Sequence, residues 1–172
     1  GSRVGILDAD IYGPSQPRML GIGGQPKSPD GKSLEPMISH QLQAMSIGFL
    51  IDEDTAMIWR GPMVTGALEQ LLNDTLWDDL DYLVIDLPPG TGDIQLTLAQ
   101  KVPVSGALIV TTPQDIALLD AKKAVKMFEK VQIPLLGIVE NMSTHICSNC
   151  GYEEHIFGEG GGRRMASEYE ID

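Results

Sequence analysis

The chain of 172 residues is poor in cysteine, in aromatic side chains and in basic charge. Its two cysteines are too few for a secreted disulfide scaffold, so we expect a reducing, cytoplasmic setting. No apolar run is long enough to cross a bilayer. Lysine and arginine number 12 against 24 acidic residues, and a net charge of −12 disfavours contact with a phosphate backbone. We therefore expect neither a membrane nor nucleic acid among its partners.

What the chain does contain is typical of a globular domain. Apolar residues make up 42% and charged residues 21%, so we expect one domain over residues 1–172 with a buried core. Acidic runs such as 78–81 are interpreted as solvated surface. Residues 11–32 are rich in Gly, Pro and Ser and are predicted to be loop.

Short runs of Val, Ile and Leu alternate with segments of helical periodicity. Strands are predicted over 4–7, 42–51, 82–85, 106–113 and 133–141, and helices over 61–77, over 114–131 and after the glycines near 160. The pattern predicts an α/β fold with a mostly parallel sheet and helices on both faces.

Apolar stripes define two of these helices. The first carries Val64, Leu68, Leu71, Leu72 and Leu76, and the second carries Ile116, Leu119, Ala124, Val125 and Phe128. Asp115 is predicted to be the N-cap of the second helix.

Small polar side chains follow the predicted strands where they end. They are Asp8, Asp10, Asp86, Thr111, Thr112 and Asn141. In open α/β sheets ligands bind beyond the carboxyl ends of the strands, so we expect a binding edge there.

Two acid-ended strands favour a nucleotide and Mg²⁺ at this edge. "LVIDLPPGTGD" has the Walker B arrangement, in which Asp86 could hold Mg²⁺ and the glycines let backbone N–H groups approach a γ-phosphate. The alternative is that Asp86 only caps the next turn. In "ILDADIYGPS", Asp10 could orient or deprotonate an attacking water, and Asp8 could hold Mg²⁺ through water.

The cysteines lie in the loop 145–158, which is expected to be a metal loop. Cys147 and Cys150 form a C-x-x-C between His145 and His155. Two such pairs across a twofold axis would give Cys₄, which suits a 4Fe–4S cluster or zinc. A Cys₂His₂ site within one chain, a redox dithiol and two unrelated surface cysteines are the alternatives.

The ordered set of motifs resembles one family. "GILDADIYGPSQPRMLG", "WRGPM", "DYLVIDLPPGTGD", "TTPQDIALLDAKKA", "GIVENMS" and "C-x-x-C-G…IFGEGGG" look like the Mrp/ApbC-type iron–sulfur cluster carrier ATPases of the MinD-like P-loop class. The resemblance extends over essentially all 172 residues.

The resemblance implies roles and partners. Asp10 matches the aspartate that positions the hydrolytic water, with Asp8 beside it, and Asp86 matches the Walker B aspartate. Gly90, Gly92 and Asp93 match switch II, Asn141 matches an adenine-binding asparagine, and Cys147 and Cys150 match the cluster-binding pair. The implied protein binds ATP and Mg²⁺, holds a 4Fe–4S cluster at a homodimer interface, and transfers it to apo-protein clients with assembly factors. A zinc-stabilised interaction module and a MinD/ParA-like positioning ATPase are the rival functions.

The family's Walker A loop is not found in this sequence. Gly31-Lys32 follows no predicted strand, and no other Gly-Lys pair is present. We therefore expect the chain to be a segment whose first strand and P-loop lie upstream, and to bind ATP weakly or not at all by itself, because the P-loop provides most phosphate contacts.

Overall fold

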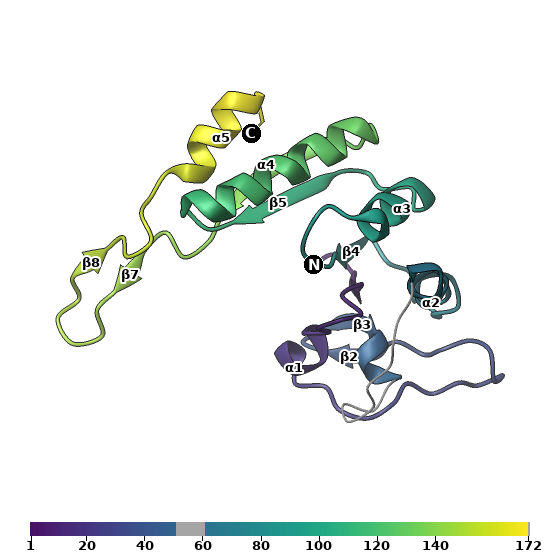
Figure 1. The fold of residues 1–172 in the computed structure, drawn as a ribbon. Helices are drawn as coiled ribbons and strands as arrows, with labels where there is room; N and C mark the ends of the chain where they lie inside the picture. Colours follow the sequence, from purple (N-terminus) through teal and green to yellow (C-terminus); the bar gives the residue numbers. More distant parts are fainter. Residues whose placement is uncertain (51–60, 172) are drawn as a thin grey trace. The chain divides into compact units, whose positions relative to one another are not determined.

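The computed structural model describes residues 1–50 and 61–171. Ile51, the last residue of a predicted strand, and Trp59 and Arg60 of the "WRGPM" motif lie outside the described residues. The chain forms two compact units, Gly1–Pro89 and Gly90–Asp172 (Figure 1). No helix among the described residues is long and apolar enough to cross a membrane.

The first unit is built on a four-stranded sheet in the order β2-β3-β1-β4. The strands are β1 (Val4–Asp8), β2 (Met37–Ser39), β3 (Leu42–Ser46) and β4 (Tyr82–Asp86). Strand β1 pairs in parallel with both β3 and β4, whereas β2 adds an antiparallel edge. The β2–β3 turn has positive φ at both His40 and Gln41, as a two-residue type I′ hairpin turn requires.

Two differences from prediction concern the segments around this sheet. The predicted strand 42–51 stops at Ser46, because the Ser46 hydroxyl accepts a hydrogen bond from the Gly48 N–H (3.0 Å) and starts the 3₁₀ helix η1 (Ile47–Phe49). The loop predicted over 11–32 contains a short helix, α1 (Gln16–Leu20), with Pro17 in its first turn.

Helix α2 (Gly61–Asn73) supplies apolar side chains to the core of this unit. Val64, Leu68 and Leu71 are buried with Leu7 and Met45 of the sheet. Leu76, predicted to extend the helical stripe, lies beyond the helix and is exposed.

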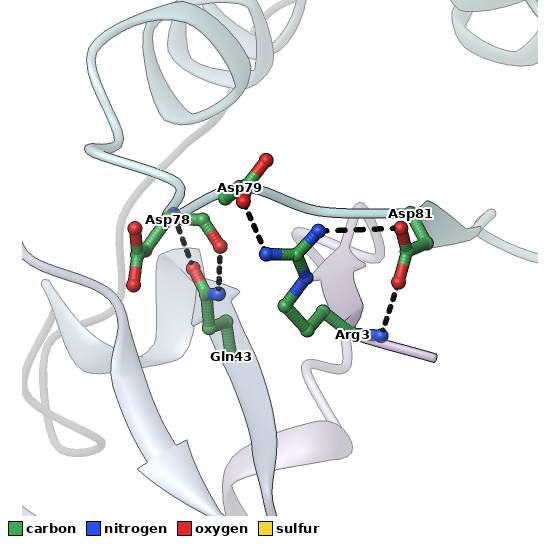
Figure 2. Close-up of polar contacts among 5 residues, drawn as sticks. All are labelled: Arg3, Gln43, Asp78, Asp79 and Asp81. Atoms are coloured by element: carbon green, nitrogen blue, oxygen red, sulfur yellow. Dashed lines mark hydrogen bonds and ion pairs between the residues drawn. The ribbon is translucent and has the colours of Figure 1, made fainter. Parts of the chain in front are cut away.

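The acidic run before β4 is tied to neighbouring strands (Figure 2). The Arg3 backbone N–H donates to Asp81 Oδ2 (2.7 Å), and its guanidinium contacts Asp79 and Asp81. Gln43 of β3 exchanges two hydrogen bonds with the backbone of Asp78, both 2.7 Å. Acids predicted to be simple solvated surface therefore hold the chain entering β4 beside β1 and β3, which is consistent with the register that sets Asp86 opposite Asp8.

The second unit combines a parallel strand pair with three helices. Its elements are α3 (Asp93–Lys101), β5 (Ala107–Thr111), α4 (Asp115–Lys130), β6 (Leu135–Glu140), the short strands β7 (His145–Ile146) and β8 (Glu153–Glu154), and α5 (Gly161–Tyr169). Helix α4 packs on β5, α5 packs on β6, and the two helices contact each other. The mostly parallel α/β class predicted from sequence is confirmed.

Helix α4 departs from its predicted cap and stripe. Its N-cap is Gln114, and Asp115 is the first helical residue. The buried face consists of Ala121, Val125, Met127 and Phe128, whereas Ile116 and Leu119 are exposed. Helix α3 was not predicted, because its sequence is polar and follows Gly92.

Candidate functional site

Two aspartates meet at the carboxyl end of the first unit's sheet. Asp8 and Asp86 are paired in register as the last residues of the parallel strands β1 and β4, and Ser46 is the partner of Asp8 on β3. Asp8 is completely buried and Asp86 is half-buried. The predicted gathering of these two acids at one sheet edge is thus observed within this unit.

The Asp8 carboxylate accepts three hydrogen bonds. Oδ2 accepts from the Gln16 N–H (3.1 Å) and the Ser46 hydroxyl (3.0 Å), and Oδ1 accepts from the Asp10 N–H (3.2 Å). These donors compensate for much of the cost of burying a carboxylate.

Gln16 links the two aspartates. Its backbone N–H binds Asp8, and its side-chain Nε2 donates to Asp86 Oδ2 (2.7 Å). Sequence reasoning identified neither Gln16 nor Ser46, because both contacts depend on the tertiary fold. The Gln-containing loop after the strand-terminal Asp8 was the available signal for Gln16, and Ser46 on β3 had none.

Burial raises the pKa of Asp8, and the negative charge of Asp86 raises it further, while hydrogen bonds from Gln16, Ser46 and Asp10 oppose the shift. Two adjacent carboxylates of this kind are stabilised in their ionised form by a nearby cation. Carboxylate oxygens are hard ligands that suit Mg²⁺, so the donor set fits this ion.

Asp10 lies in the turn that follows β1 and is only half-buried. Its Oδ1 accepts from the N–H groups of Tyr12 and Gly13, both at 3.1 Å. Because both bonds fall on one oxygen, Oδ2 is the atom that is able to accept a proton or hold a water.

The other predicted nucleotide-contacting residues belong to the second unit. Gly90 has φ of +102°, which an L side chain rarely adopts, and Gly92 is the N-cap of α3, with Asp93 as its first residue. Asn141 follows β6, where its backbone N–H donates to the Thr111 carbonyl (2.8 Å). The Asn141 side chain is exposed, and its Oδ1 accepts from the Met142 N–H (2.9 Å).

The cysteines lie on a narrow hairpin, which we call the cysteine segment (residues 141–159). Strands β7 and β8 pair in antiparallel orientation. The Cys147 N–H donates to the Tyr152 carbonyl, and the Gly151 N–H donates to the Cys147 carbonyl, both at 2.9 Å. Gly151 has φ of +73°, which closes this tight turn.

Both cysteines are free thiols and are accessible, Cys147 half-buried and Cys150 exposed. Hydrogen bonds from the backbone of Cys150 and Asn149, and from the Cys150 side chain, lower the pKa of Cys147. The turn therefore places two thiols together and favours the thiolate form that binds soft metals.

The flanking histidines do not complete a metal site. Among residues 1–50 and 61–171, no three His, Cys, Asp or Glu side chains converge on a common point. His155 uses both ring nitrogens elsewhere, with Nδ1 on the Ser143 carbonyl and Nε2 at 3.0 Å from Glu159 Oε2. Within the described residues the two thiols therefore lie together without a third ligand from the same chain.

His155 is expected to titrate above the ordinary histidine value of 6.5. The Ser143 carbonyl is the main cause of the raised pKa, and Glu159, Glu153 and Glu140 add negative charge. Because the pKa of His155 is raised in the folded state, its contacts with Ser143 and Glu159 stabilise the fold fully below the ordinary pKa of 6.5. This stabilisation is lost as pH rises through the raised pKa. An NMR titration of the His155 ring should show this, and Glu159→Gln should move the midpoint downward. A wild-type midpoint below 6.5 would contradict the assignment.

The glycine run near 160 holds an internal anion. Glu140, the last residue of β6, accepts from the Gly160 N–H at Oε1 (2.9 Å) and from the Gly162 N–H at Oε2 (2.5 Å). The backbone N–H groups of this glycine run therefore bind a carboxylate of the same chain. Sequence reasoning missed Glu140, because its partners lie 20 and 22 residues away.

Comparison with known proteins first defines the class. A nucleotide-binding protein from Archaeoglobus fulgidus, solved in complex with ADP, matches 100% of this chain and 67% of its own chain, with a TM-score of 0.83 and 40% identity. A MinC:MinD complex from Aquifex aeolicus matches at a TM-score of 0.52 and 19% identity, which shows a shared fold. The chain is thus an α/β protein of the P-loop NTPase type.

The family follows from the sequence comparison. A ParA family model described as NUBPL iron-transfer P-loop NTPase matches residues 1–172, and the chain belongs to this family. The resemblance predicted from the motifs is confirmed.

Curated relatives carry the corresponding names. An iron–sulfur cluster carrier protein of Haemophilus influenzae is 67% identical over 172 residues, covering 99% of this chain and 46% of the relative. The mouse iron–sulfur cluster transfer protein NUBPL is 48% identical over 169 residues, covering 98% of this chain and 53% of the relative. The chain spans about half the length of these two relatives.

Proposed function

We propose that the full-length protein is an ATP-dependent iron–sulfur cluster carrier. Two copies hold one 4Fe–4S cluster between their C-x-x-C pairs and transfer it to apo-protein clients. The cluster is the cargo of this process. The proposal is supported by membership of the iron-transfer family and by relatives named as cluster carriers.

One observation carries the proposal. Cys147 and Cys150 are free, close together and accessible, and among the described residues no third ligand converges on them. A pair of thiolates fills half of a four-thiolate site, so a second copy completes the cluster ligands without further sequence.

The surface around the cysteines also suits a partner. Ile146, Tyr152, Ile156 and Phe157 are all exposed within the cysteine segment. Exposed apolar side chains concentrated on one short hairpin are typical of an interaction site. A second copy would cover them while its own cysteines approach Cys147 and Cys150.

In this proposal the acidic edge of the first unit serves the nucleotide. Asp86 and Asp8 are the residues that would hold Mg²⁺, and Asp8 positions Asp86 through Gln16. Asp10 orients or deprotonates the hydrolytic water with Oδ2, because Oδ1 is engaged by two N–H groups. ATP, bound with Mg²⁺, is the substrate, and the water attacks its γ-phosphate so that the phosphoanhydride bond is cleaved.

The second unit carries the other candidate nucleotide-contacting residues. Gly90 and Gly92 present backbone N–H groups to the γ-phosphate, and Asp93 begins the helix that follows. The exposed side chain of Asn141 binds the adenine base. The nucleotide state then changes the geometry of the dimer and so the retention of the cluster.

A transfer assay tests this function. The full-length protein is reconstituted anaerobically with a 4Fe–4S cluster and mixed with an apo-form of a 4Fe–4S enzyme. We expect the enzyme to regain activity, and we expect ATP with Mg²⁺ to change the rate of this recovery. In the Asp10→Asn variant, adding ATP with Mg²⁺ should leave the rate unchanged.

The outcome separates the rival functions. A protein that holds only zinc and activates no apo-enzyme would be a zinc-stabilised interaction module. A protein that hydrolyses ATP but binds neither zinc nor a cluster would fit a positioning ATPase of the MinD/ParA kind.

A further inference from the structure

Glu140 lies where the cysteine segment leaves and rejoins the second unit. It is the last residue of β6, directly before residue 141. Its carboxylate binds the N–H groups of Gly160 and Gly162, at the start of α5 and directly after residue 159. One side chain therefore connects the two ends of the segment that carries Cys147 and Cys150.

The glycines are shaped around this carboxylate. Gly160 has φ of +72°, which turns its N–H toward Glu140. A Cβ on Gly162 would lie 3.1 Å from Glu140 Cβ, and a Cβ on Gly161 would lie 2.6 Å from Leu118 Cδ1 on α4. A side chain at Gly162 would crowd Glu140 and Ile138 of β6, so the glycine at this position permits the close approach of α5 that the carboxylate needs.

Charge also favours the contact. The N-terminus of α5 carries a partial positive charge that stabilises a carboxylate. Burial alone would raise the pKa of Glu140, but the N–H groups of Gly162 and Gly160 and the Arg164 guanidinium lower it overall. Glu140 is thus held as an anion at neutral pH.

The rest of the segment has few means of holding its own shape. Strands β7 and β8 have two residues each, and all four are exposed. A second tie, from His155 to Ser143 and Glu159, is formed by exposed or half-exposed groups and is sensitive to pH. The Glu140 contact is the more buried tie, since Gly161 and Gly162 are buried beside it.

We propose that Glu140 is a positioning residue for the cysteine pair: by tying both ends of the cysteine segment to β6 and α5, it orders the hairpin that presents Cys147 and Cys150. This role rests on the proposed cluster-carrier function. A pre-ordered hairpin loses less conformational freedom when the thiolates bind, so the bound cluster is held more tightly. Glu140 touches no cluster atom and acts only through the segment.

The test uses full-length protein reconstituted with a 4Fe–4S cluster under anaerobic conditions. Release of iron to an excess of chelator is followed by absorbance in wild type, Glu140→Gln, Glu140→Asp and Glu154→Gln. Glu154→Gln is the matched control, because Glu154 is an exposed glutamate of the same segment. Hydrogen exchange of the apo-protein is measured in parallel at Gly160, Gly162 and along β5 and β6.

We expect Glu140→Gln to release iron about tenfold faster, the cost of one lost charged hydrogen bond. Exchange at Gly160 and Gly162 should accelerate while β5 and β6 keep their protection, which separates loosening of the segment from unfolding. Glu140→Asp should fall between Glu140→Gln and wild type, and Glu154→Gln should match wild type.

Wild-type iron release by Glu140→Gln would overturn the positioning role, as would an equal acceleration in Glu154→Gln. If wild-type protein took up no cluster, the proposed function would be wrong. Hydrogen exchange of the apo-protein would then test whether Glu140 holds the cysteine segment. Unchanged protection of Gly160 and Gly162 in Glu140→Gln would show that it does not.

Discussion

Replacing either Cys147 or Cys150 by alanine in the full-length protein should abolish cluster binding altogether. In the proposed dimer each chain contributes two thiolates, so a single replacement in both copies leaves two ligands where a 4Fe–4S cluster needs four. The brown colour that thiolate-ligated clusters give should be absent after anaerobic reconstitution. Iron and sulfide analysis of the same samples provides the second measurement.

The fold should survive these replacements. Cys150 is exposed and Cys147 is half-buried, and the turn is held by backbone hydrogen bonds that alanine retains. Circular dichroism and the melting temperature should therefore match wild type. His145→Ala is the matched control for the histidine-containing alternative, and it should keep the full cluster content. A Cys147→Ala protein that stays brown, or a His145→Ala protein that does not, would refute the assignment of ligands.

The second large effect is expected at Asp8. Asp8→Ala leaves the Gln16 N–H, the Asp10 N–H and the Ser46 hydroxyl without their acceptor, the Ser46 bond being buried and the other two part-buried. Each buried unsatisfied donor costs about 1–3 kcal/mol, so the loss in unfolding free energy should be about 3 kcal/mol or more. The free energy of unfolding is measured by urea denaturation, with tryptophan fluorescence as the signal.

Asp86→Ala is the matched comparison for Asp8. Asp86 is half-buried and accepts one hydrogen bond, from Gln16, and its removal relieves repulsion with Asp8. The destabilisation should therefore be about 1 kcal/mol or less. An Asp8→Ala protein as stable as Asp86→Ala would contradict the described hydrogen bonds.

The same carboxylate should leave a mark on the pH dependence of stability. Because burial raises the pKa of Asp8, the part of its stability contribution that depends on its protonation is fully present below the ordinary aspartate value of 3.8 and is lost as pH rises through the raised value. This part of the pH dependence should be missing from Asp8→Ala. Wild type and variant with parallel stability curves above 3.8 would show that Asp8 does not titrate in this way.

Regular parts of the fold were predictable from sequence because they follow local rules. Strands β1, β4, β5 and β6 are compact apolar runs that end at or beside polar residues, and their predicted ends lie within a few residues of the observed ones. Their parallel pairing places Asp8 beside Asp86, as the strand-end argument expected.

What was missed depends on tertiary contacts or weak local signals. Helix α3 has a polar sequence after Gly92, and α1 is a single short turn in a segment rich in Pro and Gly, so neither shows apolar periodicity. Leu119 fits the helical stripe of α4 by spacing alone, yet packing leaves it exposed.

The candidate site divides in the same way. The C-x-x-C spacing makes Cys147 and Cys150 recognisable in the sequence. Gln16, Ser46 and Glu140, in contrast, act through hydrogen bonds to residues distant in the sequence. Single side chains of these types are common, and only the fold brings each to its partner. Sequence patterns therefore predicted the candidate reacting groups, and the structure showed which residues form hydrogen bonds around them.

The central claim is that the cysteine segment is half of a shared cluster site. Native mass spectrometry of anaerobically reconstituted full-length protein tests it most directly. We expect a species of two chains and one 4Fe–4S cluster, and only cluster-free protein for Cys147→Ala and Cys150→Ala. A single chain that carries a complete cluster, or a dimer that carries zinc without iron and sulfide, would contradict it.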